Sequence, residues 1–214
     1  MSDAHLREQL CHFAKSLYDR GLTGGNTGNI SVRTPDGGLL VSPTGTSFGT
    51  LDPAQLSRFD EKGVYISGLP PTKEMPIHTA FYETRSTAGA VVHLHSTHSV
   101  AYSLLPDHDP DNFLPPLTAY SIMKLGKVSL LPFYLPGDPA MGEAIRGLAG
   151  KRSAVMLANH GPVVAGKDLE SAVYAVEELE ETSKLALLME GRSINTLTTS
   201  QVSEVVSVFK VEWD

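Results

Sequence analysis

The segment Ala90–Ser99, AVVHLHSTHS, places three histidines directly after an apolar run. A short, valine-rich run of this kind predicts a buried β-strand. Side chains two positions apart in a strand point to the same face of a sheet, so His93 and His95 are expected to project together while Leu94 faces the core. Two imidazoles on one face near the end of a strand form a preformed pair of nitrogen ligands for zinc. The alternative for this pattern alone is two polar residues on a solvated strand face.

A second apolar segment, VMLANHGPVV at residues 155–164, also leads to a histidine. We expect His160 to end a strand there, with Gly161-Pro162 forming a loop at the edge of the sheet. A third imidazole from a neighbouring strand would complete a three-ligand set and leave a fourth position open for substrate. His98 competes for that third position, but it lies past the end of the predicted strand. We therefore expect His98 to support the site from outside or to pack in the core.

An acidic residue, Glu74, stands at the start of a predicted helix just upstream of the first histidine strand. Its carboxylate could act as a fourth metal ligand or as a base, or it could simply complement the helix dipole. The turn directly before it, Thr72-Lys73, offers further hydrogen-bond donors. The remaining histidines have no partner at ligand spacing, and we expect surface or packing roles for them: His5, His12, His78 and His108.

Two loops of small residues are suited to binding an anion, GGNTGN at Gly24–Asn29 and SPTGTS at Ser42–Ser47. Glycines allow successive backbone N–H groups to converge on an anion, and Asn29 and Thr44 could add side-chain donors. Neither loop matches a nucleotide-binding signature, because there is no G-x-G-x-x-G pattern and no lysine follows the glycines. The alternative is that both are tight turns at the ends of hairpins.

Strand and helix patterns alternate along the chain without a regular βαβ rhythm. Leucines and Phe13 recur at helical spacing over residues 3–20, and PDGG between ISVRT and GLLVS predicts a hairpin. Asp168 is expected to cap a long helix that ends near Gly191, with Glu180 and Lys184 paired across one turn. The last residues, VSEVVSVFKVEWD, fit a helix or a strand. The sequence therefore predicts an α/β fold over residues 1–214 as a single domain, with a mixed sheet and helices on both of its faces.

Charge and cysteine content exclude several classes of function. The formal net charge of −7 and the absence of Lys/Arg runs argue against a nucleic-acid partner, since phosphate backbones require a basic face. No apolar run is long enough to span a bilayer, and the charged first residues do not resemble a signal peptide, so we expect no membrane partner and a cytoplasmic protein. The single cysteine, Cys11, excludes an internal disulfide and a thiolate cluster. Any metal must therefore be held by histidine and carboxylate.

Taken in order, the motifs GNTGNIS, SPTG, TKEMPIH, AVVHLHSTHS and NHGPVVAG resemble those of the class II aldolase/adducin family. The resemblance covers nearly the whole chain. It implies a three-layer α/β/α sandwich around a mixed, mainly antiparallel sheet. It also implies a homotetramer with active sites at subunit interfaces. Adducins lack the full histidine set, whereas this chain keeps it, so the resemblance indicates an enzyme.

The resemblance also assigns roles to individual residues. It implies one Zn²⁺ per subunit, with Mn²⁺ or Co²⁺ as possible substitutes because imidazoles accept all three. Glu74 matches the acid/base beside the metal, and Tyr120 in LTAYS aligns roughly with a tyrosine that handles the aldehyde side in the aldolases, although a buried packing role is an alternative. The other implied positions are the metal ligands His93, His95 and His160 and the substrate- and phosphate-binding residues Gly28, Asn29, Thr44, Gly45, Thr72 and Lys73.

Within the family, PPTKE and LPPLTAYSIMKLGKVSLLPFYLPGD resemble a branch that acts as 3-oxo-tetronate 4-phosphate decarboxylases. Such an enzyme converts a phosphorylated sugar acid to dihydroxyacetone phosphate and CO₂ through a zinc-stabilised enediolate. Thr72-Lys73 stands where the sugar-phosphate aldolases carry two serines, and a lysine can meet the extra negative charge of this substrate. The alternatives are a zinc-dependent aldolase of the fuculose-1-phosphate type and a ribulose-phosphate 4-epimerase.

Overall fold

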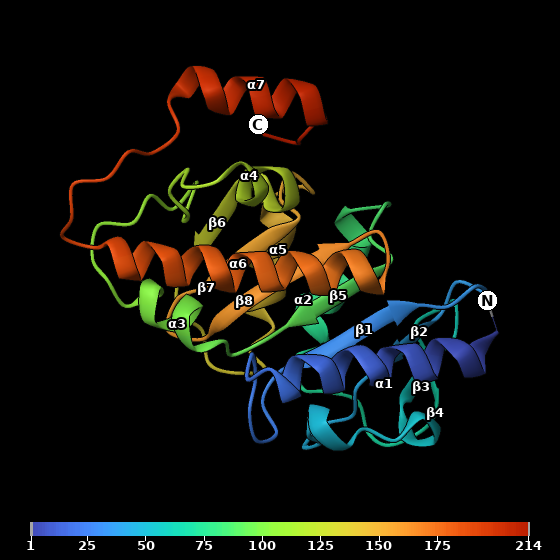
Figure 1. The fold of residues 1–214 in the computed structure, drawn as a ribbon. Helices are drawn as coiled ribbons and strands as arrows, with labels where there is room; N and C mark the ends of the chain where they lie inside the picture. The colour runs from blue at the N-terminus through green and yellow to red at the C-terminus, as the bar shows by residue number, and fades with distance from the viewer. Residues whose placement is uncertain (1, 214) are drawn as a thin grey trace.

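The strands pair into one sheet of eight in the computed structural model, which describes residues 2–213 (Figure 1). Their order across the sheet is β4-β3-β2-β1-β5-β8-β7-β6. Every neighbouring pair is antiparallel except β6 and β7, which are parallel, so the prediction of a mixed, mainly antiparallel sheet is confirmed. The strands are β1 (Asn29–Arg33), β2 (Leu39–Val41), β3 (Ser57–Phe59), β4 (Tyr65–Ser67), β5 (Ala90–His93), β6 (Val128–Leu131), β7 (Ala154–Leu157) and β8 (Gly161–Gly166).

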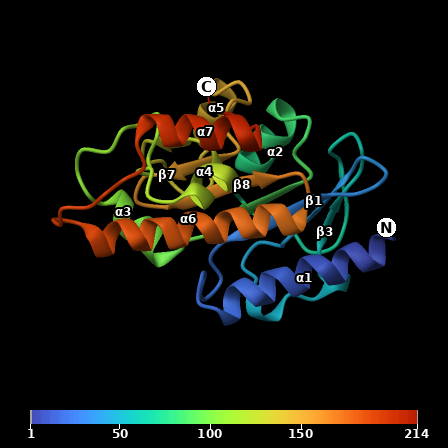
Figure 2. The same ribbon diagram turned by 45° about the horizontal axis from the view of Figure 1, so that its top comes forward.

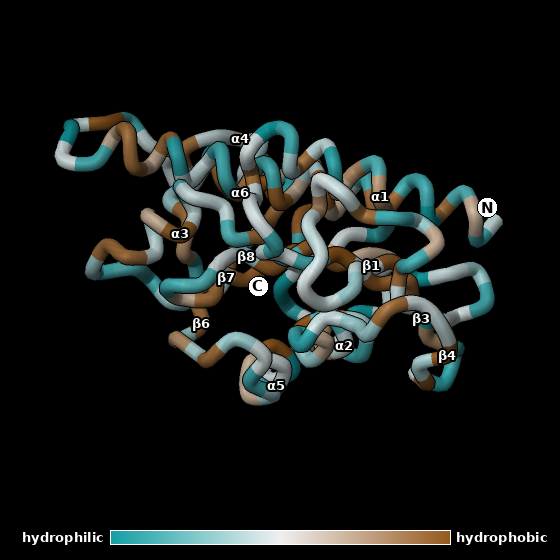
Figure 3. Tube along the Cα trace, turned by 90° about the horizontal axis from the view of Figure 1, so that it is seen from below, coloured by the Kyte–Doolittle hydropathy of each residue, from teal (hydrophilic) through white to brown (hydrophobic). Residues whose placement is uncertain are grey.

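Helices cover both faces of this sheet. In Figure 3, α1, α4 and α6 lie on one side of the strands, and α2 and α5 lie on the other. Among the described residues, no helix combines the length and apolar character needed to cross a membrane. The helices are α1 (Asp3–Asp19), α2 (Met75–Thr84), α3 (Thr97–Ser103), α4 (Ala119–Leu125), α5 (Ala140–Gly147), α6 (Leu169–Met189) and α7 (Thr199–Phe209), with short 3₁₀ turns η1 (Phe48–Thr50) and η2 (Pro53–Gln55).

The side chains of the central strands alternate between the two faces of the sheet, and this alternation explains the three layers. Ala90 and Val92 of β5 pack in the apolar cluster formed with α1 and α6, whereas Val91 between them packs in the cluster formed with α2 and α5. Strand β7 divides in the same way, with Ala154 and Met156 on the first side. A strand that is apolar on both faces requires cover on both faces, and this is why these runs contain almost no polar residue.

The local patterns in the sequence predicted most of these elements. The hairpin around PDGG is the β1–β2 pair, and Asp168 caps α6 through a reciprocal hydrogen-bond pair with Ser171. The C-terminal segment, which fitted either a helix or a strand, forms α7 and packs against α4 (Figure 2).

The predicted pairing of Glu180 with Lys184 is wrong. Glu180 is buried in α6, and its carboxylate accepts hydrogen bonds from the backbone N–H groups of His98 (2.9 Å) and Ser99 (2.8 Å). Lys184 lies 3.8 Å from Glu181 instead. The reason is tertiary: the α3 N-terminus faces α6, and its unpaired N–H groups attract a carboxylate more strongly than an exposed lysine does.

We expect Gly161→Ala to lower the free energy of unfolding by about 1–3 kcal/mol, because an added Cβ would overlap the Leu94 carbonyl oxygen where β8 passes β5. The matched control is Gly147→Ala at the exposed end of α5, where nothing lies within 4 Å of the added atom, and which is expected to be neutral or to stabilise by up to about 1 kcal/mol. Urea unfolding followed by circular dichroism measures both. Equal effects of the two substitutions would contradict the close approach of β8 to the Leu94 carbonyl.

Candidate metal centre

Three imidazoles converge at the carboxyl end of β5. The ring centroids of His93, His95 and His160 lie 4.8–4.9 Å from one another. The strand ends at His93, so the expectation that His95 belongs to the same strand is wrong, although the two Nε2 atoms still meet at 3.1 Å.

His160 arrives from the turn between β7 and β8. The predicted loop at Gly161-Pro162 is wrong, because these two residues begin β8 in the middle of the sheet. Pro162 has no N–H to donate, but its carbonyl accepts from the Leu94 N–H (3.2 Å) and from His93 Nδ1 (2.9 Å). The direct pairing of β8 with β5 therefore brings the turn that carries His160 beside His93.

Glu74 completes the cluster from the other side of the site. It is the residue that precedes the first turn of α2, as its sequence position predicted, and it is 8% exposed. Its Oε2 lies 3.3 Å from His93 Nε2, and its Oε1 lies 3.2 Å from His160 Nε2. Burial raises the pKa of Glu74, but His160, His93 and Asn29 outweigh burial and hold this pKa well below its usual range.

The protonation state of His93 leaves a nitrogen lone pair facing the centre of the cluster. Burial lowers the pKa of His93 to about 3 and also lowers that of His95, so both rings are neutral near pH 7. Since the Pro162 carbonyl can only accept, His93 carries its hydrogen on Nδ1, and its Nε2 offers a lone pair. A hydrogen bond from the second ring nitrogen to a carbonyl is the arrangement that orients metal-binding histidines.

These residues fit a divalent cation. Zinc–nitrogen bonds of 2.0–2.1 Å in a tetrahedron would separate neighbouring ligand atoms by about 3.3 Å. The Nε2 atoms of His93 and His95 lie 3.1 Å apart, close to that edge length, and the candidate ligand atoms of all four residues lie within 4.8 Å of one another. Five buried side-chain N or O atoms of the described residues lack a hydrogen-bond partner, and three of them belong to this cluster: Glu74 Oε1, His160 Nδ1 and His160 Nε2. A bound cation would satisfy His160 Nε2 at the centre of the cluster and would leave Glu74 Oε1 free to face a substrate.

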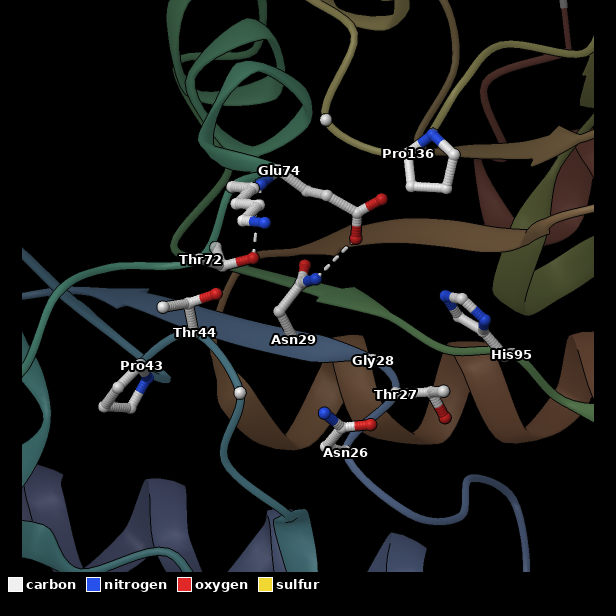
Figure 4. Close-up of a pocket in the computed structure, with 13 residues that line it drawn as sticks. Asn26, Thr27, Gly28, Asn29, Pro43, Thr44, Thr72, Glu74, His95 and Pro136 are labelled. Atoms are coloured by element: carbon white, nitrogen blue, oxygen red, sulfur yellow. Dashed lines mark hydrogen bonds between the residues drawn. The ribbon is translucent and has the colours of Figure 1, made fainter.

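The loops that the sequence marked for anion binding meet beside this cluster. One cavity of about 180 Å³ is lined by Glu74, His95 and all six predicted substrate- and phosphate-binding residues (Figure 4). Three segments that are distant in the sequence supply these residues, and Figure 4 shows Thr44, Thr72 and Asn29 around the same space. The six are Gly28, Asn29, Thr44, Gly45, Thr72 and Lys73.

Glycine is required at one of these positions. Gly28 has a φ of +82°, and an added Cβ would lie 2.9 Å from the His93 carbonyl oxygen. The loop therefore packs its backbone directly against the strand that ends in a metal-site histidine. Lys73 is exposed at the rim of the cavity and makes no ion pair within residues 2–213, so its ammonium group is available to an anionic ligand.

Other cavity residues came without a clear sequence signal. Asn26 and Thr27 lie inside the loop that was singled out, but Pro136 and Gly137 come from the segment between β6 and α5. Their Pro-Gly pair indicated only a turn. Its position over the cavity depends on how α5 packs against α2.

Two histidine expectations can be compared with the structure. His98 is not part of the cluster, and its Nδ1 bonds to Glu180 (2.7 Å), which is not a residue of the metal site, so a supporting role for His98 stays a prediction. His78 is fully buried and bonds to Asn29, so the surface interpretation offered for it is wrong. Its position four residues after Glu74 on a helix was the signal that could have found it.

Tyr120 lies outside the cavity. Its side chain is 62% exposed at the start of α4, so the alternative of a buried packing role is wrong. Its catalytic role stays a prediction.

Comparison with known proteins agrees with this geometry. Residues 8–187 match the family model of the class II aldolase and adducin N-terminal domain. A 3-oxo-tetronate 4-phosphate decarboxylase of Escherichia coli (strain K12) is 44% identical over 202 residues, which cover 94% of this chain and 95% of the relative. The enzyme of the same description from Cupriavidus necator is 40% identical and covers 99% of each chain.

Solved structures show the same fold. The crystal structure of YgbL from Escherichia coli superposes with a TM-score of 0.92 at 42% identity, covering 95% of this chain and 98% of that one. An L-fuculose 1-phosphate aldolase superposes with a TM-score of 0.84 at 25% identity, covering 98% of both chains. The chain belongs to the class II aldolase/adducin family.

Proposed function

We propose that this chain is a carboxy-lyase that converts 3-oxo-tetronate 4-phosphate to dihydroxyacetone phosphate and CO₂. The identity of 40–44% to decarboxylases of this description, over nearly the full length of each chain, carries the choice of substrate. The convergence of three imidazoles and one carboxylate at a cavity lined by anion-binding loops supports the type of reaction.

The chemistry of this substrate defines what the site must do. Loss of CO₂ breaks the bond between C1 and C2 and leaves the bonding electron pair on C2, next to the C3 ketone. His93, His95 and His160 would hold a divalent cation, which would supply a Lewis acid for that ketone oxygen. The carbon C2 then takes one proton, which gives dihydroxyacetone phosphate.

Glu74 is the group that we assign to deliver this proton. Its two oxygens have different surroundings: Oε2 accepts a hydrogen bond from Asn29 Nδ2 (2.7 Å), whereas Oε1 has no hydrogen-bond partner among the described residues. Glu74 is ionised before the reaction, so Oε1 takes up a proton from solvent and passes it to C2, while the hydrogen bond from Asn29 holds the side chain in place.

The loops around the cavity bind the anionic ends of the substrate. Backbone N–H groups near Gly28 and Gly45, together with the Thr44 and Thr72 hydroxyls, suit the phosphate. Lys73 suits the carboxylate that leaves, because it offers a mobile positive charge at the rim of the cavity.

A zinc-dependent sugar-phosphate aldolase is the second candidate, because an L-fuculose 1-phosphate aldolase shares the fold over the same length. Both reactions use the same metal site and proton transfer through Glu74, but they release different fragments. Incubation of the metal-loaded protein with 3-oxo-tetronate 4-phosphate and with fuculose 1-phosphate separates them. We expect CO₂ from the first compound, and release of aldehyde from the second without CO₂ from the first would overturn the proposal.

Two narrower proposals rest on family likeness alone: zinc rather than Mn²⁺ or Co²⁺ as the native metal, and a homotetramer with active sites at subunit interfaces. A cytoplasmic location is a third, and it rests on the charged first residues and the lack of a long apolar run in the sequence. Tyr120 is exposed at the start of α4, which is compatible with a role at such an interface.

We expect His160→Ala to lower zinc affinity by more than about a hundredfold, because it removes one of three nitrogen ligands, whereas loss of a supporting residue costs 10–100-fold. Metal analysis of the purified protein measures the effect. His98→Ala is the matched control, since His98 bonds to Glu180 outside the cluster and this variant should keep its zinc. Full zinc content in His160→Ala with loss in His98→Ala would reverse the two assignments.

Glu74→Gln should retain zinc, because three imidazoles remain, and should lower kcat by about 10²–10⁴-fold through loss of the proton donor. Zinc content and kcat are measured on the same preparation. A variant that loses zinc would identify Glu74 as a metal ligand, and one with nearly normal kcat would remove its acid/base role.

Lys73→Ser should weaken binding of 3-oxo-tetronate 4-phosphate by about 10–100-fold, the value of one hydrogen bond between charged groups, and should change binding of dihydroxyacetone phosphate much less. Inhibition and saturation kinetics give the two values. Lys62→Ser, in the exposed turn between β3 and β4, is the control and should change neither. Equal weakening of both ligands in Lys73→Ser would place the lysine on the phosphate.

A further inference from the structure

A ladder of five polar side chains runs from the cavity into the interior, between α2 and β1. The carboxylate of Glu74 bonds to Asn29 (2.7 Å), Asn29 bonds to His78 (2.5 Å), His78 bonds to Ser31 (2.7 Å), and Ser31 bonds to Tyr82 (2.8 Å). All five side chains are buried, and His78 and Ser31 are completely inaccessible to solvent.

The geometry of a helix and a strand produces this ladder. Glu74, His78 and Tyr82 are spaced by four residues along α2, which is an advance of about 6 Å per step. Asn29 and Ser31 are spaced by two residues along β1, which is an advance of about 6.6 Å. The two steps are nearly equal, so the side chains of the helix and the strand interleave in register.

The direction of every hydrogen bond in the ladder is determined at the carboxylate end. Glu74 as a carboxylate can only accept, so Asn29 must present its NH₂ group to it. The Asn29 oxygen then faces His78, whose Nε2 must carry a hydrogen. The remaining nitrogen, Nδ1, accepts from the Ser31 hydroxyl.

The neutral states of His78 and Tyr82 agree with these hydrogen-bond directions. Burial lowers the pKa of His78 to about 4, so the ring carries one hydrogen near pH 7, and the ladder requires it on Nε2. Since the Ser31 hydrogen is used by His78, the Tyr82 hydroxyl donates to Ser31. Burial raises the pKa of Tyr82 well above its usual range, which keeps this hydroxyl protonated.

We propose that His78 is a positioning residue for Glu74: it fixes the Asn29 amide so that the NH₂ group holds Oε2 and leaves Oε1 directed to the reacting carbon. This inference rests on the proposed role of Glu74 as the proton donor. Ser31 and Tyr82 act behind His78 by holding its hydrogen on Nε2. None of these three residues lines the cavity, so they affect the reaction only through Asn29 and Glu74.

The test compares His78→Leu with His78→Gln in the zinc-loaded enzyme. Leucine leaves the Asn29 oxygen without a donor, so the amide is free to rotate, whereas the glutamine amide can donate to Asn29 and accept from Ser31. We expect His78→Leu to lower kcat by about 10–100-fold, with KM within about threefold and zinc content unchanged. His78→Gln should recover most of that loss.

A second pair of variants separates positioning from general stability. Ser31→Ala removes the donor to His78 Nδ1 and should lower kcat by about tenfold. Ser129→Ala removes a buried hydroxyl from β6 that bonds to Arg152, and it should leave kcat unchanged at a comparable loss of thermal stability.

A second assay keeps this inference separate from the choice of substrate. Exchange of hydrogen with D₂O at the hydroxymethyl carbon of dihydroxyacetone phosphate, which is C2 of the substrate, is followed by NMR and measures proton transfer alone. A wild type that exchanges these hydrogens but releases no CO₂ would overturn the decarboxylase assignment, and the exchange rates of the variants would still test His78. Wild-type rates of exchange in His78→Leu would overturn the positioning role.

Crystal structures of the wild type and of His78→Leu test the positioning role even where neither decarboxylation nor hydrogen exchange is detected. The Asn29 Nδ2 to Glu74 Oε2 contact, 2.7 Å in the native chain, should be lost in the variant. An unchanged contact would overturn the proposal.

Discussion

The pairing of β5 with β8 is the constraint on which the site depends. It places Val163 opposite His93 and brings the Pro162 carbonyl within reach of both the Leu94 N–H and His93 Nδ1. One backbone carbonyl thus sets the strand register and the position of the hydrogen on the ring. The turn that precedes β8 then holds His160 beside His93, so the metal site follows from sheet pairing rather than from loop flexibility.

Glu74 lies between a region in which every buried polar side chain has a hydrogen-bond partner and a region in which some buried polar atoms have none. Buried polar groups cost free energy unless they are paired, and in the ladder behind Glu74 every member has a partner. In the metal cluster, by contrast, Glu74 Oε1 and His160 Nε2 have none. The satisfied side stiffens the carboxylate, and the unsatisfied side is completed by a cation and substrate. A single side chain can therefore be both rigidly held and chemically available.

The sequence predicted the parts of the site that depend on local pattern. His93 and His95 follow an apolar strand, Glu74 begins a helix, and the small-residue loops are recognisable from their glycines. Their meeting in one cavity also followed from the family resemblance. What local pattern could not supply was pairing between distant segments: it placed Gly161-Pro162 in an edge loop, although they begin a central strand.

The residues that were missed or wrongly predicted have positions that are set by packing between distant segments of the chain. Glu180 was assigned to an exposed pair because helical spacing favours it, but the α3 N-terminus packs against α6 and takes the carboxylate. His78 was treated as a packing or surface residue because its partners, Asn29 and Ser31, lie almost fifty residues away. Pro136 reaches the cavity only because of how α5 packs against α2.

The central claim is that three imidazoles hold one divalent cation beside Glu74. X-ray absorption at the zinc edge of the zinc-loaded wild-type protein tests it most directly. The account predicts one zinc per chain with a first shell of nitrogen and oxygen at about 2.0–2.2 Å and outer-shell scattering from three imidazoles. A shell that contains sulfur, a shell with fewer than three imidazoles, or zinc that is removed by simple dialysis would contradict it.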